Sequence, residues 1–254
     1  MRIVSVAASM LALLCLPSLA SASFQSDGQH QQQAQELSQD AREALASAMD
    51  VAKQHGDARW AFTMAYTDLG EDGPKTYRLR FDPRLAEDER WQLLDPAFES
   101  LSKDEKKTFK QIQGRDDADD GLIYDQLPID FEQLMFVSED DTRAVFEAAI
   151  VGDEMPKKMR EAVKMTITVN KVDAYLEEIT MRSIEPFKPA PIAKINTFEQ
   201  IQRYVPSSEG GPALMRDAHS DVSGKAMLKK FESKSKITYS EFEKVEIAED
   251  QDEL

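Results

Sequence analysis

The sequence predicts an α+β fold in which an open antiparallel β half-barrel wraps around an N-terminal helix. Between residues 163 and 170 apolar and polar residues alternate strictly, and residues 60–67 repeat the pattern. Successive side chains of a strand point to opposite faces, so each stretch predicts a strand with one buried and one wet face. Residues 37–52 instead place apolar side chains, many of them alanine, at helical spacing. Such a helix can pack closely on the apolar face of the sheet.

The N-terminal residues indicate a targeting segment. Arg2 precedes an apolar run that ends at Leu16, and Ala20–Ala22 supplies a small-residue cleavage site. These features predict a secretory signal peptide over residues 1–22. The apolar run is shorter than the roughly 20 residues that a membrane-spanning helix needs, so we expect no transmembrane segment. Residues 23–36 are polar and rich in glutamine, which predicts a disordered leader.

The formal net charge of −16 predicts an acidic, well-solvated surface. Nucleic acid and anionic lipid headgroups are poor general partners for such a surface, because like charges repel. Cys15 is the only cysteine and lies in the predicted signal peptide, so we expect no disulfide, thiol catalysis or zinc-thiolate site. A single half-barrel domain is predicted over residues 37–247, long enough to bury a large core, with an acidic tail over residues 248–254.

The first elements of this domain are a helix and a meander of strands. The helix covers Leu37–Ala52, and its expected role is to pack on the sheet. Residues 60–67 and 76–82 both alternate between apolar and polar side chains around a turn at Leu69–Pro74, which predicts a hairpin. A third strand is expected from Trp91.

A short helix and an acidic run follow the meander. Ser102 and Glu105 form a capping box, which predicts the start of the helix. The acidic run begins at Asp116, and we compared it with a calcium-binding loop. Such a loop needs oxygen ligands at its first, third and fifth positions and glutamate at its twelfth. Here the third position is Ala118 and the twelfth is Leu127, so the run predicts a solvated loop.

The middle of the chain predicts further antiparallel strands. Residues 143–151 are ambiguous, because their apolar residues alternate as in a strand whereas their alanines and glutamate also favour a helix. We prefer the strand. Residues 156–161 form a connector with room for one helical turn. They lead to a second hairpin over residues 162–185, whose turn is expected at Asn170–Asp173.

The last third of the chain gives a mixed pattern. Phe198, Ile201 and Tyr204 stand at helix-like spacing. Two long polar strands, Val222–Glu232 and Ile237–Ile247, are expected to close the chain. The first strand is rich in lysine and the second in glutamate. We therefore expect opposite charges to pair across the sheet, each pair contributing about 0.2–1 kcal/mol.

The sequence carries no recognisable catalytic motif. Its histidines are His30, His55 and His219, and no two of them have the spacing of a metal-ligand pair. Ser220 and Asp221 adjoin His219, but the members of a catalytic triad converge from separate segments. No nucleophile elbow or phosphate loop occurs. We therefore predict no catalytic residues, no metal site and no cofactor.

The order of the elements resembles the periplasmic lipoprotein-carrier (LolA/LolB-like) half-barrel family. The segments that carry the resemblance are Trp60–Leu94 and Ala162–Val245. The resemblance implies an incomplete antiparallel barrel around a helix, with acyl chains held in its cavity. Residues 179–195 and 236–245 also resemble exported proteobacterial proteins of similar layout.

We therefore predict a soluble periplasmic binding or carrier protein for an apolar ligand, such as a lipid or a lipoprotein acyl chain. Ligand sites are mostly apolar clefts, and methionine adapts to varied ligands. The candidate lining residues are Trp60, Phe62, Met64, Tyr66, Leu79, Phe81, Met165, Ile167 and Met181. The same residues also fit a core that the helix fills completely.

Two alternatives stay open. The first is a non-catalytic envelope accessory protein that acts through protein–protein contacts, with the loops at residues 116–121 and 207–212 as its surfaces. The second concerns localisation. Gln251–Leu254 resembles an endoplasmic-reticulum retention signal of the KDEL type, so the endoplasmic reticulum lumen is the alternative to the periplasm.

Overall fold

A computed structural model describes residues 39–245, apart from residues 57, 71–72, 114–121, 125–128, 131–132, 153–154, 208–210 and 228. The predicted signal peptide, the polar leader, the acidic run at residues 116–121 and the acidic tail lie outside the described residues. None of the described helices has both the length and the apolar composition that crossing a membrane requires.

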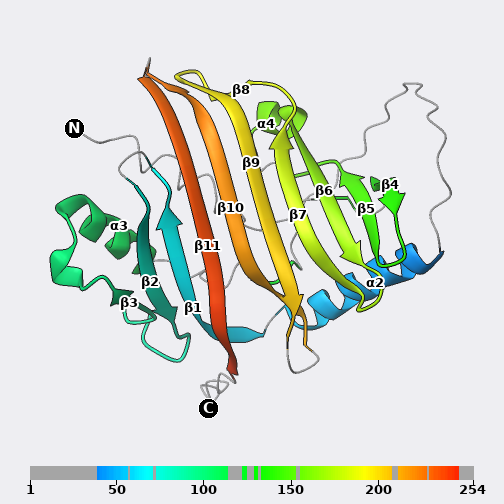
Figure 1. Ribbon diagram of the computed structural model, residues 1–254, viewed down its shortest axis with the longest axis horizontal. Coiled ribbons are helices and arrows are strands. Elements are labelled where there is room, and N and C mark those ends of the chain that lie inside the picture. Colours follow the sequence, from blue (N-terminus) through cyan, green and yellow to red (C-terminus); the bar gives the residue numbers. More distant parts are fainter. Residues whose placement is uncertain are drawn as a thin grey trace, which may run out of the picture.

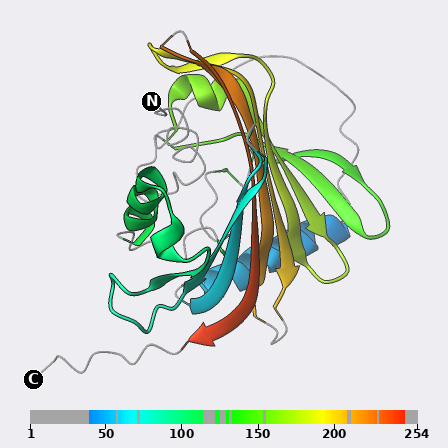
Figure 2. The ribbon, with the colours of Figure 1, turned by 60° about the vertical axis from the view of Figure 1, so that its left-hand side comes forward.

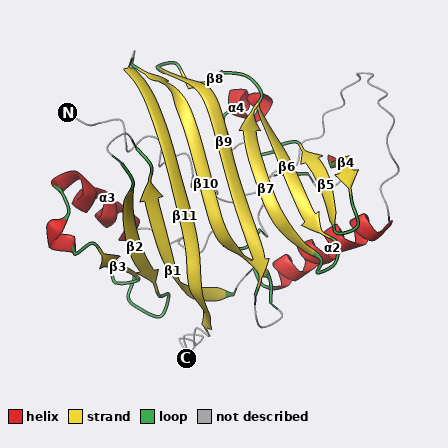
Figure 3. Ribbon diagram, viewed as in Figure 1, coloured by secondary structure: helices red, strands yellow, loops and turns green. Residues whose placement is uncertain are grey.

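An open antiparallel sheet of eleven strands dominates the protein (Figures 1 and 3). Its order is β3-β2-β1-β11-β10-β9-β7-β6-β5-β4, and β8 pairs with β9 beside this path. The strands are β1 (Arg59–Asp68), β2 (Lys75–Phe81), β3 (Trp91–Asp95), β4 (Met135–Glu139), β5 (Arg143–Ala148), β6 (Val163–Asn170), β7 (Tyr175–Ser183), β8 (Phe187–Ala190), β9 (Ala193–Pro206), β10 (Ala213–Ala226) and β11 (Lys229–Val245). The early strand β1 lies beside the last strand, β11, and β3 and β4 form the two edges.

The strands that the sequence predicts from alternation are confirmed. β1 and β2 pair as a hairpin, and β6 and β7 pair as the second one. The second turn forms because the side-chain oxygen of Asn170 accepts hydrogen bonds from the backbone N–H groups of Val172 and Asp173, both at 3.0 Å. The ambiguous stretch after Arg143 is a strand, β5, which pairs with β6.

The helix-like spacing of Phe198, Ile201 and Tyr204 is misleading, because all three belong to strand β9. Phe198 and Tyr204 are buried and lie an even number of residues apart, so both point to the same face of the sheet. Ile201 lies an odd number of residues from each and points to the opposite face. The spacing therefore does not mark a helix here, and the three residues do not all share one face.

The two closing strands exist, but their predicted boundaries are wrong. The chain turns between Ala226 and Lys229, inside the stretch Val222–Glu232 that the sequence predicts to be one strand. No glycine or proline marks this turn in the sequence. As a result, the lysine-rich run is divided between both strands of the hairpin. Lys225 stands opposite Lys230, where the sequence predicts opposite charges.

Helices flank the sheet on one side (Figure 2). Among the described residues they are α2 (Gln39–Gln54), α3 (Lys103–Gln113) and α4 (Lys157–Ala162), with a short 3-10 turn, η2, at Phe98–Ser100. The capping box of α3 is confirmed. The backbone N–H of Ser102 donates to the Glu105 carboxylate at 2.8 Å, and the backbone N–H of Glu105 donates to Ser102 Oγ at 3.3 Å.

The N-terminal helix α2 packs against β6 and β7 (Figure 1). The hairpin of β1 and β2 lies on the other side of β11, β10 and β9. Buried alanines such as Ala44 and Ala48 line the contact face of α2. This small-residue stripe fits against the aliphatic side chains of β6 and β7, whereas the aromatic rings of β1 and β2 pack on one another. The wrapping of the sheet around α2 stays a prediction.

The two faces of the sheet differ in chemistry. Residues directly opposite one another on paired strands point to the same face. Met165 and Met181 form one such pair, and both are buried. We call this face the inner face. On the other side, which we call the outer face, Lys164 pairs with Glu147 at 2.8 Å.

Candidate functional site

The predicted lining residues lie on the inner face, where all but Met64 and Tyr66 are buried, but they form two separate groups. The first group lies on the hairpin of β1 and β2 and comprises Trp60, Phe62, Met64, Tyr66, Leu79 and Phe81. The second group lies on β6 and β7 and comprises Met165, Ile167 and Met181. Strands β11, β10 and β9 separate the two groups. The structure therefore does not bring the predicted residues together in one place.

The first group is centred on Phe62, whose side chain is fully buried. Its ring centroid lies 5.2 Å from that of Phe81, 5.8 Å from that of Trp91 and 5.5 Å from that of Tyr239. Tilted and edge-on ring pairs at such distances are favourable. The sequence identifies Trp91 as the start of a strand but not as part of this cluster, and Tyr239 reaches it only because β11 pairs with β1.

The second group is packed more completely. Ile167 is 0% exposed and Met165 is 1% exposed, and α2 covers their strands. Beside them, Tyr124 packs edge-on against Tyr204 at 5.2 Å between ring centroids. The Tyr124 hydroxyl accepts a hydrogen bond from the backbone N–H of Leu176 at 3.2 Å. These side chains act as core.

A row of opposed residues joins the two groups across the middle of the inner face. Consecutive register pairs place Tyr66 beside Ile237, Ile237 beside Ala218, Ala218 beside Gln202, and Gln202 beside Ile179. We call these residues the inner-face row. Ile179 is buried, whereas the other four are only partly buried. Along this row the inner face is thus buried at Ile179 and more accessible from Gln202 to Tyr66.

Two buried hydrogen-bond donors without partners lie in the first group and beside it. The indole N–H groups of Trp60 and Trp91 are buried and have no hydrogen-bond acceptor. A buried donor without an acceptor costs about 1–3 kcal/mol. Burial also raises the pKa of the nearby Tyr239 hydroxyl to about 12. The first group therefore combines an apolar surface with unused hydrogen-bond donors.

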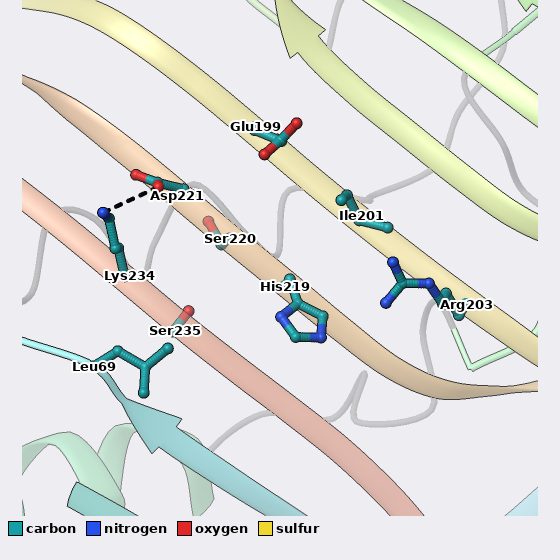
Figure 4. Close-up of a pocket in the computed structure, with 9 residues that line it drawn as sticks. All are labelled: Leu69, Glu199, Ile201, Arg203, His219, Ser220, Asp221, Lys234 and Ser235. Carbon is teal, nitrogen blue, oxygen red and sulfur yellow. Dashed lines mark ion pairs between the residues drawn. The ribbon is translucent and has the colours of Figure 1, made fainter. Parts of the chain in front are cut away.

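The outer face carries a shallow hollow of about 260 Å³ (Figure 4). It is lined by Leu69, Glu199, Ile201, Arg203, His219, Ser220, Asp221, Lys234 and Ser235. None of the predicted lining residues belongs to this hollow. Ser220 alternates with His219 and Asp221 along β10, so its side chain points to the other face and cannot complete a triad with them.

An ion-pair network borders this hollow. Asp217, which is 7% exposed, accepts hydrogen bonds from Arg216 at 2.6 Å and from Arg203 at 3.0 Å. His219 Nε2 lies 3.3 Å from the same carboxylate, and Arg203 also contacts Glu178 at 2.8 Å. Burial tends to raise the pKa of Asp217, but the two arginines outweigh it and lower that pKa below its usual value. The charged groups of this network pair with one another, as in a structural ion-pair cluster.

The described part of the chain contains no group of three or more histidine, cysteine, aspartate or glutamate side chains that could hold a metal ion. No protein-family model, curated protein or solved structure matches this chain. The candidate site therefore rests on its own geometry. That geometry favours the inner-face row and the aromatic cluster at its β1 end.

Proposed function

We propose that the protein binds an apolar ligand against the inner face of its sheet and carries it in the bacterial envelope. The observation that supports this most directly is the inner-face row, a mostly partly buried strip that runs from the aromatic cluster to the buried residues of β7. An elongated acyl chain has the shape and the chemistry to cover such a strip, because binding removes apolar surface from water. The half-barrel wrapping of the sheet around α2 belongs to this proposal.

The aromatic cluster offers hydrogen-bond donors that could bind a polar end of the proposed ligand. The Trp60 and Trp91 indole N–H groups are buried donors without acceptors, and Trp91 packs on Phe62 beside Tyr239. A carboxylate or an ester carbonyl would accept hydrogen bonds from such donors and relieve their cost. We therefore propose a fatty acid or a fatty-acyl ester as the ligand class, with its oxygen atoms at the β1 end of the inner-face row.

Met64 is the residue through which to test the proposal. It is partly buried on the inner face, opposite Leu79 and Tyr239. Met64→Trp fills the space beside the inner-face row and should weaken the binding of a fluorescent fatty acid about tenfold or more. Ala65→Trp, on the same strand but on the outer face, is the matched control and should leave binding unchanged.

The proposed polar end has a test of its own. Trp91→Phe removes the indole donor and keeps an aromatic ring. It should weaken a probe with a free carboxylate about fivefold, the value of one hydrogen bond, and should leave an alkyl probe without oxygen unaffected. If the mature protein binds no fatty-acid probe at all, the proposal is wrong.

One observation favours the alternative function, an envelope accessory protein that acts through protein contacts. The edge strand β4 exposes Met135 at 57% and Val137 at 52%, and an open strand edge can pair with a strand of another protein. Met135→Lys together with Val137→Lys would abolish capture of such a partner and leave probe binding intact. The two functions are therefore separable by experiment.

The proposal also includes export. Cleavage after Ala22 would leave Ser23 at the mature N-terminus, and N-terminal sequencing of the protein from a periplasmic fraction tests it. An intact Met1, or retention in the endoplasmic reticulum through Gln251–Leu254, would contradict the periplasmic localisation.

A further inference from the structure

Two turns meet at one end of the sheet, where β8 is connected to β9 and β10 to β11. The backbone N–H of Met227 donates to the carbonyl oxygen of Ile192 at 3.0 Å, which joins the two turns. Figures 1 and 2 both show these turns together at one end of the molecule, and α2 together with the end of β11 at Val245 toward the opposite end. The strands therefore present the joined turns as a single projecting tip.

Lysines stand side by side on this tip. Lys225 of β10 is directly opposite Lys194 of β9 on one side and Lys230 of β11 on the other. All three side chains are exposed and, as register partners, point to the same face. Like charges directly opposite one another destabilise a sheet, so this arrangement is unfavourable without a counter-charge.

The backbone holds the lysines in this row. The register between β9 and β10 shifts beside Gly224, where a Cβ atom would lie 2.4 Å from the carbonyl oxygen of Lys194. Only glycine permits such a close approach of the two strands. The shift sets which side chains of β9 stand opposite Lys225, so the backbone of the fold fixes the position of Lys194 beside Lys225.

The row has no internal counter-charge. Among the described residues, no carboxylate forms an ion pair with Lys194, Lys225 or Lys230. The next acidic residue on β11, Glu232, already pairs with Lys234 at 2.8 Å. Lys188 and Lys229 are also exposed at this end, and Glu185 is the exposed carboxylate of the connection that leads to β8. The tip is thus locally basic on a chain with a net charge of −16.

Large apolar side chains project from the same turns. Ile192 is 66% exposed and Met227 is 75% exposed, and the nearby Ile184 is 58% exposed. Exposed apolar residues among lysines are typical of a protein segment that dips into the boundary between lipid headgroups and acyl chains. We call Ile192, Lys194, Lys225, Met227 and Lys230 together the lysine tip.

We propose that the lysine tip docks on an anionic lipid surface. Ile192 and Met227 enter the headgroup region, and the lysine row contacts the lipid phosphates. Lipid is favoured over an acidic protein because the two most exposed apolar residues of the tip, Ile192 and Met227, project from its turns beside the lysines, and lipid offers an apolar layer and anionic phosphates together. The acidic remainder of the surface does not prevent this contact, because charges are screened beyond about 8 Å at physiological salt.

The lysine row is tested by vesicle flotation of the full-length mature protein. Vesicles of phosphatidylcholine with phosphatidylglycerol should bind it, and vesicles of phosphatidylcholine alone should not. Each lysine beside an anionic surface contributes about fivefold to partitioning. Replacing Lys194, Lys225 and Lys230 by serine should therefore weaken binding about a hundredfold. The control replaces the exposed α3 lysines Lys103, Lys107 and Lys110 by serine, which changes the net charge equally and should leave binding intact.

The apolar residues have a separate test. Met227→Asp should abolish binding to the anionic vesicles. Val172→Asp, at the exposed turn between β6 and β7 where Val172 is 69% exposed, should not. Equal loss in the test and control variants would show that only net charge matters and would overturn the proposal. Absence of wild-type binding to anionic vesicles would also overturn it, whether or not the inner face holds a ligand, and would leave an acidic protein as the partner to seek.

Discussion

The assignment of inner and outer faces makes a sharp prediction at two neighbouring residues of β6. Ile167 is 0% exposed and stands opposite Phe146 on one side and Ile179 on the other. Thr166, the residue before it, points to the outer face and stands opposite Glu147 and Thr180. We predict that Ile167→Asp unfolds the protein, whereas Thr166→Asp is tolerated.

The magnitudes follow from the two environments. Ile167→Asp loses about 1.5–3 kcal/mol of apolar burial and places a carboxylate among apolar side chains, which costs several kcal/mol more. The total is comparable with the about 5–15 kcal/mol that stabilises a typical domain. Thr166→Asp instead places a carboxylate opposite Glu147, a repulsion of about 1 kcal/mol or less. Lys164 already pairs with Glu147 at 2.8 Å and reduces that repulsion further.

Urea unfolding followed by circular dichroism measures the difference. A milder pair keeps the test quantitative if Ile167→Asp cannot be purified folded. Ile167→Ala should lower the free energy of unfolding by about 2–5 kcal/mol, and Thr166→Ala by about 0.5 kcal/mol or less. Equal losses in the two alanine variants would show that the faces are assigned wrongly, and the location of the inner-face row would then be refuted as well.

Two further predictions concern single residues. Hydrogen bonds from Ser102 and Tyr77 lower the pKa of Glu105 from 4.5 to about 2. The ionised Glu105 therefore stabilises the folded protein fully above pH 4.5, and this contribution is lost as the pH falls toward 2. Acid unfolding of Glu105→Gln should depend less steeply on pH over that range, and an unchanged pH profile would contradict the hydrogen bonds. Gly224→Ala should destabilise the protein by about 1–3 kcal/mol or more in thermal unfolding, because the added Cβ would lie 2.4 Å from the Lys194 carbonyl oxygen, where β9 pairs with β10. Gly70→Ala is the control and should cost less, because the nearest atoms to its added Cβ are side-chain atoms of Asp68 at 3.3 Å and beyond.

Local patterns predict the local elements of this fold well. The alternation in β1, β2 and β6 and the capping box at Ser102 each depend on residues a few positions apart, and the structure confirms them. In β9 the same reasoning fails, because the three-residue spacing of Phe198, Ile201 and Tyr204 resembles that of a helix, whereas Phe198 and Tyr204 alone fit one face of a long strand. Only the neighbouring strands β7 and β10 decide between the two.

The arrangement of the candidate site depends on contacts that no local pattern contains. The pairing of β1 with β11 brings Tyr239 onto Phe62 across most of the chain. The turn between Ala226 and Lys229 brings Lys225 opposite Lys230 within what the sequence suggests is one strand. Likewise, nothing in residues 39–54 indicates that α2 packs on β6 and β7. The predicted lining residues lie on one face of the sheet, but no local pattern divides them into two groups.

The central claim is that the inner face holds an acyl ligand, and native mass spectrometry of the purified mature protein tests it most directly. We predict a bound mass in the range of a fatty acid or a fatty-acyl lipid, released on denaturation, absent from Met64→Trp and retained by Ala65→Trp. Detection of the bare polypeptide mass alone, with no uptake of added fatty acid, would contradict the claim.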